Sequence, residues 1–263
     1  MNHSLPVPLD VKLMNLTANV LLLGFMLLAL GAGGKWVVRH PVFAIRGLTV
    51  LGDISHTSAL TLRAHVGAQL TGTFLTVDLN AVRQAFETVP WVRRAVVQRE
   101  FPNRLRVILQ EHRAVAYWGE ESESTLVNSF GEVFEANLGE VEQDELPRLD
   151  GPAEQSAQVL DMYRELQPLF AALDLPLEQL VLSSRGNWRA QLAGGASIEL
   201  GSGGAPEVTA RARQFLGTVG QVAAHHGRDL GALEAADLRY GQGYALRLRG
   251  VSTVAGQDQT KRH

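Results

Sequence analysis

Residues 78–111 read DLNAVRQAFETVPWVRRAVVQREFPNRLRVILQE, and the apolar spacing changes within this stretch from helical to strand-like. Asp78 is suited to cap a helix, and apolar side chains recur at helical spacing over residues 79–86. Pro90 ends that pattern, and beyond it apolar and polar residues alternate on both sides of a turn at residues 102–103. The stretch therefore predicts one helix followed by a hairpin of two strands.

A further strand and helix precede this stretch. Residues 43–51, FAIRGLTVL, read as a strand, and Thr57-Ser58 can cap a short helix that Gly67 ends. The predicted order over residues 43–112 is thus β-α-α-β-β. Two helices on one face of a three-stranded sheet would bury both sets of apolar side chains.

An apolar segment lies near the N-terminus. Residues 13–34, between Lys12 and Lys35, carry no formal charge. As a helix they would span about 33 Å, enough for a hydrocarbon core of about 30 Å. Trp36 follows where an interfacial aromatic anchor would lie. We expect a transmembrane helix here after a tail at residues 1–12; a cleaved secretory signal with its apolar core at residues 20–30 is the alternative. The flanking charges leave the orientation open.

From residue 113 onward short strands alternate with two long helical patterns. The helices are expected at residues 156–173 and 205–225, and the strands around them form a mixed β domain over residues 113–250. Residues 251–263 are polar and are expected to be disordered. The fold class predicted for the whole chain is α+β.

The amino-acid composition narrows the classes of protein to which the chain can belong. The 263 residues are 46% hydrophobic, so a buried core is expected. Twenty-four Lys+Arg against 27 Asp+Glu give a net charge of −3. A dedicated nucleic-acid-binding protein would be expected to carry a basic excess, so this class is disfavoured. The absence of cysteine excludes disulfides and thiolate zinc sites.

Motifs for catalysis are weak throughout the chain. Ser197 lacks the final glycine of a nucleophile elbow, and Gly201-Ser202-Gly203-Gly204 lacks the Lys-Ser/Thr ending of a phosphate loop. His225 and His226 are adjacent on a predicted helix, so their side chains diverge by about 100°. We predict no catalytic, cofactor-binding or metal site.

Several motifs together resemble the FtsQ/DivIB family of bacterial cell-division proteins. The most specific are Pro90-Trp91-Val92, Phe101-Pro102-Asn103-Arg104-Leu105 and Glu111-His112-Arg113-Ala114-Val115-Ala116, with Ala114 where the family often has Pro. Further matches are Val127-Asn128-Ser129-Phe130-Gly131, Leu149-Asp150-Gly151-Pro152 and Asp237-Leu238-Arg239-Tyr240. The resemblance covers residues 13–249. It implies a POTRA domain at residues 43–112 and then the β domain with its two helices.

The resemblance also implies a location and a role. Both domains would be periplasmic, on an uncleaved inner-membrane helix whose N-terminus is cytoplasmic. The protein would be a non-enzymatic scaffold at the division septum that links early and late division proteins. It would bind FtsB and FtsL through the β domain and other divisome proteins through its POTRA and transmembrane regions. No cofactor and no nucleic acid is implied.

The expected docking site is the last strand of the β domain, residues 244–249. No later strand is predicted to cover it, and an uncovered edge invites a partner strand. By resemblance Arg239, Tyr240 and Gly243 match the partner-binding stretch, and Arg185 matches a second basic contact; Tyr244 begins the edge strand. We assign Tyr240 as an aromatic anchor, Arg239 and Arg185 as carboxylate partners, and Gly243 as a position of backbone clearance.

Two features of this site qualify the expectation. The family often has Asp-Ser-Gly in the turn after the tyrosine, whereas this chain has Gly241-Gln242-Gly243. From the residues alone, a buried Tyr240 with a merely solvated Arg239 is an equally good interpretation.

Two other function classes stay open at this point. One is an extracytoplasmic cell-wall enzyme that uses Glu or His residues. The other is a POTRA component of outer-membrane transport or assembly, which normally requires several repeats or a following barrel.

Overall fold

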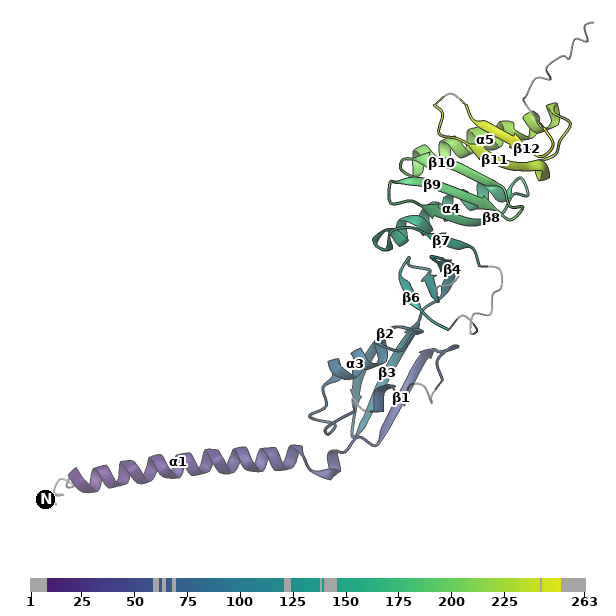
Figure 1. Cartoon of the computed structure of the whole chain (residues 1–263). Coiled ribbons are helices and arrows are strands. Elements are labelled where there is room, and N and C mark those ends of the chain that lie inside the picture. The colour runs from purple at the N-terminus through teal and green to yellow at the C-terminus, as the bar shows by residue number, and fades with distance from the viewer. Residues whose placement is uncertain are drawn as a thin grey trace, which may run out of the picture. The chain divides into compact units, whose positions relative to one another are not determined.

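A computed structural model describes residues 9–58, 62, 65–67, 70–120, 124–137, 139, 146–241 and 243–251 (Figure 1). The first element that it describes is the helix α1, Leu9–Val38. Almost all the described side chains of α1 are exposed, so in the described part of the chain little besides the hydrogen bond from the Thr73 hydroxyl to the Val38 carbonyl, at 2.8 Å, holds this helix. Residues 10–38 are long and apolar enough to cross a membrane. The helix is longer at both ends than the expected residues 13–34. Most of the expected tail at residues 1–12 lies outside the described residues.

The chain divides into two compact units between Glu111 and His112. In the first unit, β1 (Gly47–Asp53), α3 (Leu79–Glu87), β2 (Val92–Glu100) and β3 (Arg104–Glu111) follow α1. The three strands form a sheet in the order β1-β3-β2, with β1 parallel and β2 antiparallel to the central β3.

The first strand starts later than its apolar pattern suggested. Residues 41–43 instead form a short 3₁₀ helix, η1 (Pro41–Phe43), because proline fixes a helical φ at the first position. The His40 Nδ1 caps it by accepting the Val42 N–H at 3.4 Å. The helix expected at residues 57–67 is described only in part: Leu62 and residues 65–66 are helical, and the Leu62 N–H donates to the Ser58 carbonyl at 3.1 Å.

The core of this unit lies between α3 and the sheet. Asp78 caps α3 by accepting the N–H groups of Asn80 and Ala81 at 2.8 and 3.2 Å, as its sequence position predicts. Phe86 is completely buried with Val82 and with alternate residues of β3. The predicted helix phase is therefore confirmed.

Glu111, the last residue of β3, holds the loop that follows β1. Its Oε2 accepts the N–H groups of Ser55 and His56 at 3.0 and 3.1 Å, and its Oε1 accepts the Thr57 N–H at 2.9 Å. Burial raises the pKa of the Glu111 carboxyl, but these hydrogen bonds outweigh it and hold the pKa below its usual range. The His56 ring in turn stacks on Trp91 with ring centroids 4.0 Å apart.

The second unit is one nine-stranded sheet with two long helices. Its strands are β4 (Ala114–Trp118), β5 (Thr125–Asn128), β6 (Val133–Glu135), β7 (Arg148–Asp150), β8 (Leu177–Leu182), β9 (Asn187–Leu192), β10 (Ser197–Ser202), β11 (Leu233–Asp237) and β12 (Ala245–Leu248). The sheet order is β12-β11-β10-β9-β8-β7-β4-β5-β6. The helices are α4 (Ser156–Ala171) and α5 (Ala205–His225), with short 3₁₀ turns η4 (Ala153–Gln155) and η5 (Leu230–Ala232). The α+β prediction is confirmed, including the two helices of the β domain.

Both long helices cover the same face of this sheet (Figure 1). Trp188, Phe170 and Phe215 are the largest of the side chains buried between them. Along β9 buried and exposed residues alternate strictly, so the opposite face of the sheet is open in the described part of the chain. The final residues of the expected tail, from 252 onward, lie outside the described residues.

The pairing of β4 with β7 is short and is reinforced by a side chain. β4 pairs with β7 through Tyr117 opposite Arg148 and Trp118 opposite Leu149, and the Arg148 side chain donates to the carbonyls of Gly119 and Glu120 at 3.0 Å.

The turn between β5 and β6 packs on the start of α4. Gly131 has a φ of +81°, and a Cβ built on it would lie 2.5 Å from the Ala157 Cα, so only glycine fits. Its carbonyl accepts the Ser156 hydroxyl at 2.6 Å, and the Arg164 guanidinium donates to the Ser129 carbonyl at 2.7 Å.

Candidate functional site

The strand β12 is an edge strand of the nine-stranded sheet. It pairs antiparallel with β11, in a register that sets Asp237 opposite Ala245 and Ala235 opposite Arg247. Its other edge meets no strand among the described residues. The main-chain groups along that edge are therefore available to another chain.

The loop from Leu238 to Tyr244 connects these two strands and carries most of the predicted site residues. Leu238 is buried, and its N–H donates to the Glu199 carbonyl of β10 at 2.8 Å. This bond continues the pairing of β11 with β10 for one more residue and fixes the start of the loop.

Arg239 makes a forked ion pair within its own chain. Its Nε and one terminal nitrogen donate to the two Asp237 oxygens at 2.8 and 2.6 Å. The guanidinium of Arg239 lowers the pKa of Asp237, and the carboxylate in turn raises the pKa of Arg239. Gly201, at a φ of +82°, leaves room for the Arg239 stem, since a Cβ there would lie 3.2 Å from the Arg239 Cγ. Arg239 is thus held in place before any partner arrives.

The two tyrosines of the loop point in different directions. Tyr240 is 60% exposed, so the interpretation of Tyr240 as a core residue is wrong. Tyr244 is half-buried: its ring meets Phe215 of α5 edge-on at 5.0 Å, and its hydroxyl lies 2.9 Å from the Thr218 hydroxyl. Tyr244 therefore fastens the loop to α5, while Tyr240 is presented to solvent.

A hollow of about 250 Å³ lies between this loop and α5. Its lining includes Arg239 and Tyr240 from the loop and Glu207, Arg211 and Phe215 from α5. The Arg211 guanidinium donates to the Ser202 carbonyl at 2.5 Å, and in the described part of the chain its buried Nε has no partner. The hollow thus offers aromatic surface beside two cationic groups.

The sheet face on the other side of the loop is shallowly concave and lined by small residues. Ser197, Ala235 and Ala245 lie there, in a hollow of about 370 Å³. The two carboxylates of the hollow are paired within the chain: Glu199 contacts Arg189 at 2.6 Å, and Asp237 contacts Arg239. A segment laid along β12 would therefore meet small side chains, these two ion pairs and the exposed side chain of Arg247.

The glycines of the loop leave free space. A Cβ on Gly243 would meet no atom within 4 Å, and the same holds for Gly241. The fold of this chain itself thus sets no steric demand for glycine at position 243. Gln242, between them, lies outside the described residues.

Arg185 lies in the turn between β8 and β9 and is exposed. The register sets Asn187 of β9 opposite Ser202 of β10, and Glu199 of β10 opposite Asp237 of β11. Arg185 and the 238–244 loop therefore lie at the same end of the sheet, with β9 and β10 between them. Arg185 lines neither of the two hollows described above.

Three residues of this site were missed by sequence reasoning: Asp237, Arg211 and Phe215. Asp237 is two residues before Arg239 at the end of a strand, a spacing that signals a local pair. Arg211 and Phe215 are far away in the sequence, and no local pattern could place them against the loop. Among the residues that the structure describes, no group of three His, Cys, Asp or Glu side chains could hold a metal ion.

Comparison with known proteins gives matches along almost the whole chain. A family model described as POTRA domain, FtsQ-type, matches residues 43–112, and one described as Cell division protein FtsQ/DivIB, C-terminal, matches residues 116–239. Among curated proteins, a "Cell division protein FtsQ" from Thiomonas arsenitoxydans is 42% identical over 97% of this chain and 93% of its own length. Proteins of the same name from Burkholderia pseudomallei and Bordetella pertussis are 37% and 35% identical, over 96% and 91% of this chain and 99% and 92% of their own lengths.

Proposed function

Because the chain belongs to the FtsQ/DivIB family of cell division proteins, we propose that it is a membrane-tethered, non-enzymatic scaffold of the division machinery. In this proposal the β domain holds the FtsB–FtsL pair along β12, and the POTRA domain recruits the protein to the septum. The long matches to proteins named for cell division favour this role over a cell-wall enzyme or a transport component.

The observation that carries the proposal is the open edge of β12 beside an exposed aromatic side chain. A partner strand added to that edge would gain affinity from main-chain hydrogen bonds, and the neighbouring side chains would set its specificity. Tyr240 fits the role of anchor, since rigid aromatic side chains dominate the binding energy of many interfaces.

The geometry refines the roles of the charged residues. Arg239 uses two of its five N–H groups on Asp237, so three N–H groups, two of them on the other terminal nitrogen, are left for a carboxylate of the partner. Arg185 would supply a second cation at the same end of the sheet. Tyr244 acts in this proposal by positioning the loop, and Gly243 leaves clearance for the partner's backbone.

We further propose that α1 spans the inner membrane with the N-terminus in the cytoplasm and both compact units in the periplasm, at the division septum. One long apolar helix near the N-terminus supports this arrangement, together with the family membership.

Co-purification of FtsB with the full-length protein tests the docking site. Tyr240→Ala should weaken binding about thirtyfold or more, the effect of losing roughly 2 kcal/mol at an interface anchor. Phe130→Ala is the matched control, because Phe130 is a similarly exposed aromatic (58%) at the β5–β6 turn. Arg239→Glu should abolish binding, with exposed Arg213 of α5 reversed in the same way as its control.

Arg239→Glu also sets a second carboxylate against Asp237, so Arg239→Gln serves as a milder variant. Thermal melts of all variants separate lost binding from lost folding. Wild-type binding by folded Tyr240→Ala and Arg239→Gln variants would show that partners dock elsewhere.

A further inference from the structure

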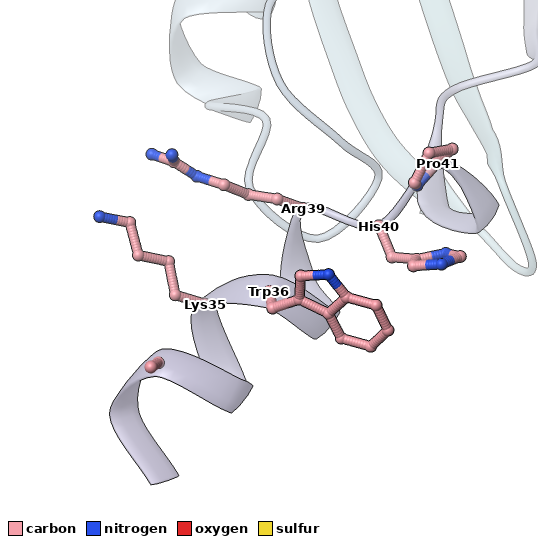
Figure 2. Close-up of a pocket in the computed structure, with 6 residues that line it drawn as sticks. Lys35, Trp36, Arg39, His40 and Pro41 are labelled. Atoms are coloured by element: carbon pink, nitrogen blue, oxygen red, sulfur yellow. The ribbon is translucent and has the colours of Figure 1, made fainter. Parts of the chain in front are cut away.

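The end of α1 forms a hollow of about 380 Å³, which we call the α1-end hollow. It is lined by Ala32, Lys35, Trp36, Arg39, His40 and Pro41. Figure 2 shows the Lys35 and Arg39 side chains extending to the same side of the helix, with Trp36 beside His40. These residues are close together in the sequence, so the hollow is formed by one helical turn and the bend that follows it.

The charges of this hollow are of one sign. Arg39 directly follows the last residue of α1, and its N–H donates to the Lys35 carbonyl at 3.2 Å, so the two cations lie one helical turn apart, where like charges repel. Neither contacts a carboxylate among the residues that the structure describes, and residues 35–52 carry three basic residues and no Asp or Glu. The negative end of the helix dipole favours each cation singly but provides no anion to bridge the two.

The aromatic side of the hollow is equally well defined. Trp36 is 67% exposed, and its ring meets the His40 ring edge-on at 5.1 Å. The His40 Nδ1 accepts the Val42 N–H, so a neutral His40 carries its proton on Nε2 and can donate from there. The cations Lys35 and Arg39 and the ring N–H of His40 thus lie near the Trp36 indole. Tryptophan is a side chain that prefers the level of lipid headgroups.

The hollow also lies at the right distance along the helix. The uncharged residues 13–34 are about as long as the hydrocarbon core is thick, so Lys35 comes at the level where lipid phosphates begin. Lysine and arginine stems can lie along the apolar surface while their charged ends reach that level.

We propose that the α1-end hollow binds the phosphate of an anionic phospholipid headgroup between Lys35 and Arg39, with Trp36 packed at the headgroup level. The inference rests on α1 spanning a bilayer, as in the proposed function, but it holds for either orientation. Phosphate is the fitting group because its several acceptor oxygens can take donors from both cations at once.

Native mass spectrometry of the full-length protein in detergent tests this, with phosphatidylglycerol and phosphatidylcholine as the competing probes. The wild type should prefer phosphatidylglycerol about thirtyfold, the contribution expected of two basic residues near an anionic surface. Lys35→Gln/Arg39→Gln should bring the preference close to one. Arg94→Gln/Arg113→Gln removes the same charge from exposed positions elsewhere and should leave the preference unchanged.

A second readout uses tryptophan fluorescence in nanodiscs. Trp36 is exposed, whereas Trp91, Trp118 and Trp188 are at most 6% exposed, so lipid quenchers reach Trp36 first. Brominated phosphatidylglycerol should quench the wild type more than brominated phosphatidylcholine does, and the two should quench the Lys35→Gln/Arg39→Gln variant equally.

Three results would overturn the inference: an undiminished lipid preference in Lys35→Gln/Arg39→Gln, displacement of the lipid by millimolar inorganic phosphate, or release of the wild type from membranes by carbonate. The last would also contradict the proposed membrane span. Since docking at β12 does not involve α1, the variant should still co-purify FtsB, so failure of the lipid site and failure of the partner site are distinguishable.

Discussion

Replacing Phe86 by alanine should destabilise the POTRA domain strongly and leave the second unit folded. Phe86 is completely buried between α3 and the sheet, together with Val82 and Leu105. Removing a buried phenylalanine ring costs about 3–5 kcal/mol, from the lost burial and the cavity that remains. The total stability of a domain is about 5–15 kcal/mol, and one as small as this lies toward the lower end.

The loss should be visible in a thermal melt. For a domain of this size each kcal/mol lowers Tm by about 4–8 °C, so the POTRA transition should fall by about 12 °C or more. The chain divides into two compact units between Glu111 and His112, and each has its own hydrophobic core, so separate transitions are expected by calorimetry. Only the first should move in the Phe86→Ala variant.

Val96→Ala provides the control. Val96 lies on the open face of the same sheet and is 42% exposed, so its truncation should cost under about 1 kcal/mol. A Phe86→Ala melt that matches the wild type, or a shift no larger than that of Val96→Ala, would refute the placement of Phe86 in the core.

Three further predictions concern other parts of the chain. Because the pKa of Glu111 is lowered in the folded state, its carboxylate stabilises the domain above the ordinary pKa of 4.5, and this stabilisation is lost as pH falls through the folded pKa. The Glu111→Gln variant should therefore lose less POTRA stability than the wild type during an acid titration, and an unchanged profile would contradict this. Gly131→Ala should destabilise the second unit in urea titrations by more than Gly186→Ala does, because both have positive φ but only the former would clash with Ala157; equal losses would show that the clash is relieved. The full-length protein should stay in the membrane fraction with its N-terminus intact, whereas Edman sequencing that begins near Gly31 would identify a cleaved signal.

Local patterns predicted the first unit well because its information is local. The cap at Asp78, the apolar spacing that ends in Phe86 and the alternation along β3 each depend on neighbours a few residues away. The same patterns placed the start of β1 too early, since they did not weigh the helical φ that Pro41 imposes.

The proposed docking site was less accessible to sequence reasoning because its parts meet only in the folded chain. Tyr240 and Tyr244 are four residues apart on either side of a glycine turn, and no periodicity decides which of them faces outward. The outcome depends on Phe215 and Thr218 of α5, which hold Tyr244. Likewise, Arg239 could be recognised from its motif. The motif did not reveal that the Arg239 guanidinium is already hydrogen-bonded to the Asp237 carboxylate.

The order of strands in the second unit has a mechanical consequence. The chain enters the nine-stranded sheet at β4, whereas β12 is the seventh strand from there when β4 is counted as the first. If a partner is held at β12, as proposed, a load between that partner and α1 would have to pass through each strand pairing from β4 to β12. The pairing of β4 with β7 is the shortest on that route, since it joins only two residues of each strand.

Side chains strengthen the short pairing of β4 with β7. Arg148 reaches the carbonyls of Gly119 and Glu120, and Arg164 of α4 reaches the Ser129 carbonyl at the neighbouring turn. These side chains add to two backbone hydrogen bonds at the same pairing, from Tyr117 to Pro147 and from Gly119 to Leu149, both at 2.9 Å. Separation at this pairing would leave strands β7 to β12, with the proposed docking edge, as one continuous sheet.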